Sequence, residues 1–323
     1  MSSDERLFDF QTVGRETVQL LFSAFSPKAA VTGFTPIHGG MSTSNYAVKT
    51  AGTEKRYVLR IYPANNDHSL LEAAAYAYAE KAICVPEICF FDGSKRLLPN
   101  SYLIMELIEG LPLGDFIAAK EQLPDDLVRG IGASLALLHC TQYPYMALLD
   151  DALYPVKRLE SLEAQCLSLL NGIAGAHLRP PTKEKALAFL QCNPGFFREI
   201  DCEYVFSHGD FNFSNILITP AMQTYFIDFE YCFSAPRFYD AGKFFRTKSP
   251  DIQRYITPSA AAAFCEGYNL NAAKPLPREW YALSKLADLP AMLYLINKPD
   301  IPEGWGDDID NEIVRTLALF DLL

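Results

Sequence analysis

A short polar stretch between two apolar runs is the most specific feature of this chain. Residues 207–230 read SHGDFNFSNILITPAMQTYFIDFE, which places His208, Asp210 and Asn215 in one loop and Asp228 at the end of the next apolar run. Phosphoryl transfer needs a carboxylate that accepts the proton of an attacking hydroxyl, and oxygen ligands that hold magnesium against the phosphates. One segment supplies both kinds of group, so the sequence predicts this chemistry.

The spacing within the segment assigns a role to each residue. Asn215 follows Asp210 by five positions, as in a kinase loop of the form HxDxxxxN. We expect Asp210 to be the catalytic base, Asn215 and Asp228 to bind Mg²⁺, and His208 to shape the loop. The alternative is an ordinary turn and a buried strand with capping carboxylates, but two motifs in this order arise together by chance far less often than one.

A glycine-rich string in the first fifty residues is the candidate phosphate-binding loop. Gly39, Gly40, Ser42 and Ser44 lie between two expected strands. Glycines let backbone N–H groups approach a phosphate, and hydroxyls add donors. A plain hairpin turn is the alternative interpretation of this string.

Four further residues are candidates for nucleotide binding. Arg60, in the strand-like run YVLRIYP, can hold phosphate oxygens with its forked donors, and Glu72 on the following helix is its expected ion-pair partner. Exposed surface charges are the alternative for both. Glu106 and Ile108 fall where a strand passes into a hinge, which suits an adenine ring, although a buried strand end would have the same residues.

Composition excludes several classes of protein. The chain has 323 residues, half of them hydrophobic, and no long uncharged apolar run, so we expect no membrane span. The acidic start has no signal-peptide pattern. The cysteines form no CxxC pair, which indicates reduced thiols in a cytoplasmic protein. A net charge of −11 argues against a nucleic-acid surface and is compatible with a cationic small substrate.

The order of expected elements indicates an α+β fold with two lobes. Residues 1–105 form a small, strand-rich nucleotide-binding lobe with one helix near 69–82, residues 106–110 form a hinge, and residues 106–323 form a larger helical lobe that binds the acceptor. In the second lobe we expect strands only at NILIT and TYFIDFE. Helices are expected there near residues 127–139, 156–170, 182–190, 238–247, 258–268, 278–297 and 309–322.

Taken together, these motifs resemble the aminoglycoside phosphotransferase family, which is related in fold to choline kinases and, more distantly, to protein kinases. GGMSTSN, YVLR, LLEAAAYA, MELIEG, LALLH, HGDFNFSN and IDFE occur in the family's order, and HGDxxxxN with IDFE is the specific part. The resemblance implies a protein-kinase-like bilobal fold. It also implies ATP or GTP as donor with Mg²⁺, Arg60 on the nucleotide phosphates, and Asp240 as a brace for the catalytic loop. We expect a monomer or a homodimer in the cytoplasm.

The acceptor is the least specified part of this prediction. An aminoglycoside-type antibiotic is the first expectation, and a metabolic kinase for choline, homoserine or a sugar is the nearest alternative; a pseudokinase is a further one. The carboxylates of GWGDDIDNE (residues 304–312) could bind ammonium groups or could simply cap a helix. Four aromatic residues could stack on a ligand or belong to the core: Trp280, Tyr281, Tyr294 and Trp305.

Overall fold

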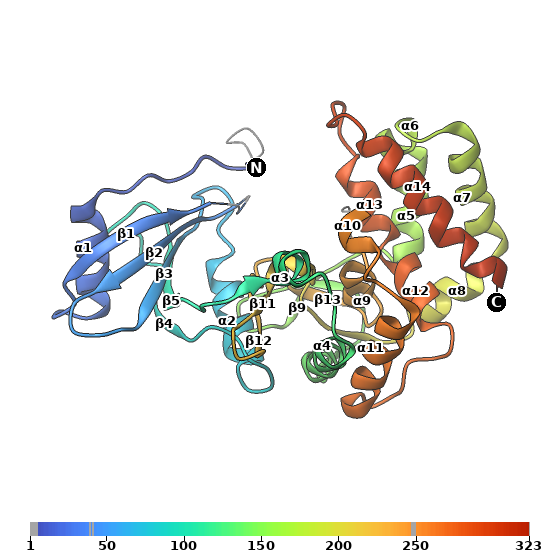
Figure 1. Cartoon of the computed structure of the whole chain (residues 1–323). Helices are drawn as coiled ribbons and strands as arrows, with labels where there is room; N and C mark the ends of the chain where they lie inside the picture. Colours follow the sequence, from blue (N-terminus) through green and yellow to red (C-terminus); the bar gives the residue numbers. More distant parts are fainter. Residues whose placement is uncertain (1–5, 39, 41, 247–249, 323) are drawn as a thin grey trace. The chain divides into compact units, whose positions relative to one another are not determined.

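The computed structural model describes residues 6–38, 40, 42–246 and 250–322 of the chain. Contacts divide these residues into two compact units (Figure 1). The first unit contains the chain up to Gly110 together with Asp150–Leu153 and Thr219–Glu230. The second unit contains Leu111–Leu149, Tyr154–Ile218 and the chain from Tyr231 onward.

An antiparallel five-stranded sheet forms the centre of the first unit. Its strands lie in the order β1 (Val31–Ile37), β2 (Ser44–Thr50), β3 (Arg56–Ile61), β5 (Tyr102–Glu106) and β4 (Ile88–Asp92). The helix α1 (Arg15–Phe25) precedes the sheet, and α2 (Ser69–Ala79) connects β3 to β4. The later strand β12 (Thr224–Phe226) also belongs to this unit.

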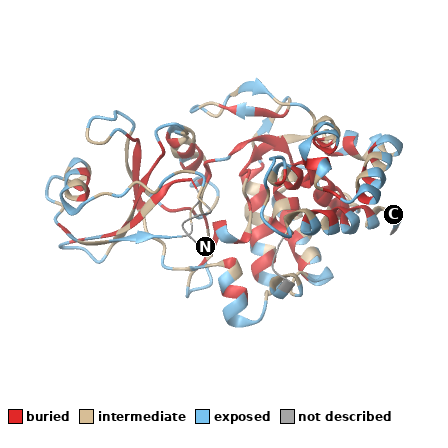
Figure 2. Ribbon diagram, turned by 90° about the horizontal axis from the view of Figure 1, so that it is seen from above, coloured by how far each residue is buried: buried red, intermediate tan, exposed pale blue. Residues whose placement is uncertain are grey.

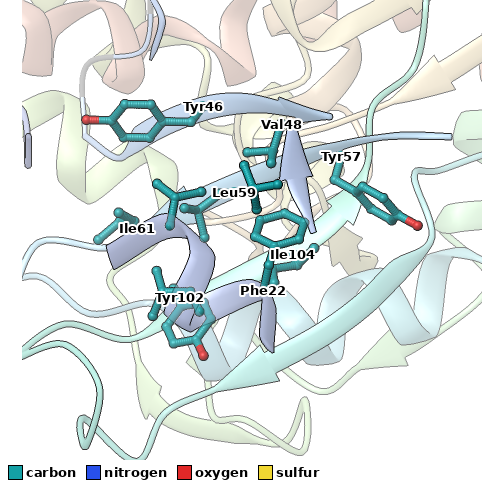
Figure 3. Close-up of a cluster of buried hydrophobic side chains, with 11 residues drawn as sticks. Phe22, Tyr46, Val48, Tyr57, Leu59, Ile61, Tyr102 and Ile104 are labelled. Carbon is teal, nitrogen blue, oxygen red and sulfur yellow. The ribbon is translucent and has the colours of Figure 1, made fainter. Parts of the chain in front are cut away.

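The core of the first unit joins α1 to one face of its sheet. Val18, Leu21 and Phe22 of α1 are fully buried, and their spacing places them on one side of the helix. Figure 3 shows Phe22 among side chains from the sheet, including Leu59 and Ile104. Burial alternates along β2, as expected for a strand with one covered face.

A smaller share of the second unit is in strands than of the first, and these strands form two sheets. One sheet has the order β7 (Gln142–Tyr143), β10 (Tyr204–Ser207), β13 (Phe233–Pro236), β8 (Ala147–Leu149) and β9 (Pro155–Arg158). In another, β6 (Leu111–Pro112) pairs antiparallel with β11 (Ile216–Ile218). The segment between β10 and β11 carries His208, Asp210 and Asn215.

Helices supply most of the second unit, and Figure 2 shows buried residues on their inner sides and exposed residues on the outer turns. They are α3 (Leu113–Lys120), α4 (Asp125–Leu138), α5 (Leu162–Asn171), α6 (Ile173–Ala176), α7 (Pro180–Cys192), α8 (Pro194–Ile200), α9 (Tyr239–Phe244), α10 (Pro250–Gln253), α11 (Pro258–Asn271), α12 (Trp280–Ala287), α13 (Leu289–Leu295) and α14 (Trp305–Ala318), with short 3₁₀ turns η2 (Phe213–Asn215) and η3 (Phe320–Leu322).

The predicted α+β class is confirmed, but several predicted elements were wrong. The helix expected near 156–170 begins only at Leu162, because residues 155–158 form the edge strand β9. The helix expected over 278–297 is broken at Asp288, and α13 begins at Leu289 with Pro290 in its first turn. TYFIDFE is a strand only over Thr224–Phe226. No helix in the described part of the chain combines the length and apolar character needed to cross a bilayer.

Candidate active site

The loop after β10 has a backbone that requires glycine. Gly209 has a φ of +79°, and a Cβ placed on it would lie 2.0 Å from the carbonyl oxygen of Tyr231. Only glycine accepts both conditions. The next N–H group, of Asp210, donates to Nδ1 of the buried His208 at 3.3 Å. The loop is therefore shaped by His208, as the sequence predicted.

Asp240, at the start of α9, holds the same loop through hydrogen bonds to its backbone. The carboxylate is fully buried and accepts hydrogen bonds from Ser207 Oγ (2.8 Å) and from the N–H groups of His208 (2.8 Å) and Gly209 (3.0 Å). Nε2 of His139 lies 3.2 Å away. Burial acts to raise the pKa of Asp240, but the hydrogen bond from His139 and the other donors lower it overall. The carboxylate is thus held ionised, and its bonds brace the loop.

The carboxylate of Asp210 is held on both oxygens. Lys243 Nζ lies 2.9 Å from Oδ1, and Asn215 Nδ2 donates to Oδ2 and to the backbone oxygen of Asp210, each at 2.9 Å. The Asp210 side chain is 29% exposed. Burial acts to raise its pKa, but the charge and hydrogen bond of Lys243 lower it below the ordinary value. Asp210 is therefore an ionised, oriented carboxylate that solvent can reach.

The amide of Asn215 is turned so that its oxygen is available. Its Nδ2 donates to Asp210, whereas, among the described residues, its Oδ1 accepts only a long hydrogen bond, of 3.4 Å, from the hydroxyl of Ser214. Asn215 ends the 3₁₀ turn η2, whose first turn is capped by the side chain of Asn212. An amide oxygen in this state is a suitable ligand for a hard cation.

In the first unit, a single guanidinium faces three carboxylates. Arg60 on β3 forms ion pairs with Glu72 on α2 at 3.0 Å, with Asp228 at 2.5 Å and with Glu230 at 3.5 Å. Arg60, Glu72 and Glu230 are almost fully buried, whereas the Asp228 side chain is 29% exposed. The ion pair between Arg60 and Glu72 that the sequence predicted is present.

The charge balance of this cluster shifts two pKa values upward. Burial raises the pKa of Glu72 to about 7; Arg60 opposes this effect, while Asp228 adds to it. The hydroxyl of Tyr62 donates to Glu72 Oε2, whereas Oε1 is buried and has no hydrogen-bond partner among the described residues. The three carboxylates raise the pKa of Arg60 despite its burial. The cluster holds more negative than positive charge.

Asp228 has a backbone conformation that is rare outside glycine. Its φ is +71°, and such left-handed residues cost on the order of 1 kcal/mol and gather at functional sites. Its N–H donates to the hydroxyl of Tyr76 at 3.0 Å, and the ring of Tyr76 packs edge-on against Phe229 at 5.1 Å. These contacts hold the strained residue and direct its carboxylate toward Arg60.

Each unit, taken by itself, offers oxygen donors of the kind that a divalent cation such as magnesium prefers. Oxygens of Glu72, Asp228 and Glu230 lie within 4.8 Å of one another, and Arg60 is ion-paired with all three carboxylates. A partly exposed carboxylate in this cluster, and the amide oxygen of Asn215, are hard ligands of the kind Mg²⁺ prefers. The donor set is thus compatible with the expected metal.

The described residues of the glycine-rich string precede β2 or begin it. Gly39 lies outside the described residues, the carbonyl of Gly40 accepts from Arg6, and Ser42 is buried. Ser44 begins β2 and is buried, and its hydroxyl accepts from the N–H of Gln11 at 2.8 Å.

At the other predicted position, Glu106 is half-buried at the end of β5. Its N–H donates to the carbonyl of Glu87 at 2.9 Å. Ile108, also half-buried, follows in the segment that leaves the sheet. The nucleotide-binding roles of these residues stay predictions.

Comparison with known sequences decides the family. The profile of the phosphotransferase enzyme family, abbreviated APH, matches residues 33–283, which is most of the chain. This chain belongs to the phosphotransferase enzyme family. The predicted family and the prediction of a phosphotransferase are confirmed. A search of curated protein sequences found no match to the phosphotransferase.

Solved structures agree on the fold of this phosphotransferase. A putative aminoglycoside phosphotransferase from Ralstonia eutropha has a TM-score of 0.65 at 13% identity, over 95% of this chain and 97% of that one. Choline kinase LicA from Streptococcus pneumoniae gives 0.61 at 16%, over 94% and 98%. A thermostable aminoglycoside phosphotransferase mutant, in a complex with ADP and hygromycin B, gives 0.62 at 13%, over 94% and 98%. At these identities the likeness shows the fold, and the kinase-like class is confirmed.

Two side chains of the phosphotransferase site were given no role by the sequence argument. Lys243, which contacts Asp210, lies three residues after Asp240 and therefore on the same face of α9. That helical spacing is the signal that could have identified it. Glu230 entered only as the last residue of the IDFE motif, yet its carboxylate is buried and faces Arg60.

Proposed function

We propose that this phosphotransferase moves the γ-phosphoryl group of ATP or GTP to a hydroxyl of a small molecule, with Asp210 as the base. The observation that supports this proposal best is the Asp210 carboxylate, which is ionised, partly exposed and held by Lys243 and Asn215. In the reaction the acceptor oxygen forms the new P–O bond, the bond from the γ-phosphorus to the bridging oxygen breaks, and the nucleoside diphosphate leaves. Asp210 takes the hydroxyl proton.

The first unit would bind the nucleotide. Arg60 would contact the phosphates and Glu72 would orient it, which their buried ion pair supports. The loop with Gly39, Gly40, Ser42 and Ser44 is proposed for the phosphates, although the Ser44 hydroxyl already accepts a hydrogen bond from Gln11. The adenine or guanine ring would lie against the end of β5, with backbone groups of Glu106 and Ile108.

Asn215 and Asp228 would hold Mg²⁺, since both offer an oxygen to a hard cation. The ion would neutralise charge on the phosphates when bound. The role of the chain is to keep these ligands in place. Asn215 is anchored through its amide nitrogen, and Asp228 through the hydroxyl of Tyr76. The free thiols of all eight cysteines are compatible with a reducing compartment, and we propose the cytoplasm.

An aminoglycoside-type antibiotic is our first acceptor. It is supported by the family, and by structures of the same fold that include a putative aminoglycoside phosphotransferase and an aminoglycoside phosphotransferase mutant in complex with hygromycin B. Such a substrate carries several ammonium groups, so the acceptor region should offer carboxylates that are not already paired with cations of the chain.

One observation favours a metabolic small-molecule kinase as a second candidate. In the acidic segment 304–312, Asp310 is bound by Arg179, and Glu312 pairs with the buried Lys285. Asp307 and Asp308 lie in the first turn of α14, where carboxylates stabilise the helix end. The segment is therefore occupied by structural contacts, which weakens the argument for a polycationic acceptor. Choline and homoserine carry one cationic group each and a neutral sugar carries none, so these acceptors need fewer unpaired carboxylates than a polycationic antibiotic.

A turnover screen tests both candidates. The purified chain would be incubated with Mg²⁺ and either ATP or GTP, together with a panel of aminoglycosides and a panel of small alcohols, and the phosphorylated product would be identified by mass spectrometry. Transfer to an aminoglycoside supports the first acceptor. Transfer only to an alcohol overturns it in favour of the second. Nucleotide binding without transfer to any member of either panel would favour a binding module.

Substitution of the base tests the mechanism. Asp210→Asn keeps the size and the contact with Asn215 but removes the proton acceptor, so kcat should fall by about 10³-fold or more while nucleotide binding stays within about threefold. Asp126→Asn, an exposed change in the same unit, is the matched control and should behave like the parent. Parent-like turnover by Asp210→Asn would remove Asp210 from its proposed role.

A further inference from the structure

A buried lysine lies beside the proposed base. Lys243 Nζ is 2.9 Å from Asp210 Oδ1, and the Lys243 side chain is only 12% exposed. Residues 207–230, which supply the rest of the catalytic motif, contain no lysine or arginine. The positive charge at Asp210 therefore comes from α9, a different element that also carries Asp240.

The packing of α9 fixes where this lysine can reach. A Cβ added at the neighbouring Gly242 would lie 2.1 Å from the carbonyl oxygen of Ser284 on α12, so the two helices are in backbone contact there. Asp240, on the same face as Lys243, is tied to the loop by its hydrogen bonds. The ring of Tyr239 lies 5.9 Å from the ammonium group. Lys243 is thus carried by a helix that is fixed on two sides.

A second carboxylate competes for the ammonium group. Asp288 is fully buried, attracts Lys243 electrostatically and pairs with Arg246 at 3.3 Å. Neither of its oxygens accepts a hydrogen bond from any described residue. Lys243 nevertheless donates to Asp210, which is more exposed. Since burial of a cation is costly unless it is paired, this choice of partner indicates a role at Asp210 beyond stability.

We propose that Lys243 is a positioning residue for phosphoryl transfer: it fixes one oxygen of Asp210 while Asn215 fixes the other. The inference rests on the proposed function, in which Asp210 is the base. A carboxylate held at both oxygens keeps its remaining lone pairs in one direction, toward the acceptor hydroxyl. Misorientation of a reacting group costs rate rather than binding. Lys243 should therefore affect kcat and leave nucleotide affinity almost unchanged.

Three variants test this proposal. Lys243→Met removes the charge at similar length, Lys243→Arg retains it, and Lys285→Met is the matched control that removes another buried cation of the same unit, paired with Glu312. Each would be assayed for Mg²⁺-dependent phosphate release from ATP or GTP, and for transfer to any acceptor found in the screen. Binding of fluorescent N-methylanthraniloyl-ADP and the melting temperature would be measured in parallel.

We expect kcat of Lys243→Met to fall by about 100-fold with the nucleotide Kd within about threefold, and Lys243→Arg to recover about tenfold of that loss. Lys285→Met should keep kcat within about threefold of the parent once folded. If Lys243→Met does not fold, Lys243→Arg decides alone: a kcat at least about threefold below the parent with unchanged nucleotide affinity supports the proposal.

Three results would overturn the proposal. The first is a parent-like kcat in Lys243→Met, or in Lys243→Arg if the methionine variant does not fold. The others are equal losses of kcat and nucleotide affinity, and a kcat of Lys243→Arg no higher than that of Lys243→Met. These outcomes differ from a failure of the proposed function. A parent chain that neither binds the fluorescent nucleotide nor releases phosphate would overturn the function itself, and this inference with it.

Discussion

In the first unit one guanidinium faces three carboxylates, whereas in the second unit one carboxylate, Asp240, accepts hydrogen bonds from four groups. The first arrangement depends on a single charge, and it leaves negative charge in excess near the partly exposed Asp228. The second depends on backbone N–H groups whose positions are set by the loop. A cluster of the first kind is suited to receive a cation, and one of the second kind is suited to hold a base in place.

Removing the single charge of the first cluster should have the largest effect. Arg60→Met leaves Glu72 and Glu230 buried without their cation, which should lower the free energy of unfolding by about 3–5 kcal/mol. Arg56→Met, also on β3, removes the partly exposed partner of the exposed Glu109 and should cost less than about 1 kcal/mol. Urea unfolding of both variants measures the difference. Equal losses would show that the cluster does not depend on Arg60.

Removing the hydrogen-bonded carboxylate of the second unit should cost slightly less. Asp240→Asn turns an amide hydrogen toward groups that already donate, so we expect a loss of about 3 kcal/mol in unfolding free energy. Asp126→Asn is the control, because Asp126 is an exposed aspartate of the same unit whose ion pair with Arg129 lies in solvent; its loss should be below about 1 kcal/mol. A loss for Asp126→Asn as large as that for Asp240→Asn would reverse the comparison.

A change in the backbone of the same loop should have an intermediate effect. Gly209→Ala introduces a Cβ 2.0 Å from the carbonyl oxygen of Tyr231 at a positive φ, which should cost about 2 kcal/mol. Gly130→Ala, in the exposed middle of α4 with nothing near the added Cβ, should instead stabilise by up to about 1 kcal/mol. Thermal unfolding measures the change in stability of each variant. A Gly209→Ala variant more stable than the parent would contradict the requirement for glycine at this positive φ.

The smallest effect concerns Asp67, which precedes the helix that carries Glu72. Hydrogen bonds from Ser69, Ser101 and Lys95 outweigh burial and lower its pKa to about 2. Because the folded-state pKa lies below the ordinary value, its stabilisation is present above pH 4 and is lost as pH falls through about 2.

Asp67→Asn should therefore cost about 1 kcal/mol at pH 7 and almost nothing near pH 2. Unfolding free energies measured across this range test it, with Asp126→Asn as an exposed control. A cost that does not change with pH would exclude this contribution of the carboxylate.

Much of the first unit could be predicted from local sequence, because its strands are rich in β-branched and aromatic residues and are separated by turn residues. In the second unit β10 and β13 were not predicted. Each is four residues long, and most of their residues are buried, so neither shows alternation. Short buried runs of this kind are ambiguous without their partners. The strand β9 was taken for the start of a helix for a related reason, since its pairing with β8 is tertiary.

The sequence by itself determined the family, the chemistry and the order of the catalytic motifs, because catalysis requires fixed residue types at fixed short spacings. Only the tertiary structure decided which charges neutralise one another. Arg60 meets Asp228, and Lys243 meets Asp210, across long sequence separations that no local pattern records. Electrostatic energy depends on distance in space and on burial. The ionisation and the partners of each carboxylate are therefore set by the folded structure and not by the local sequence.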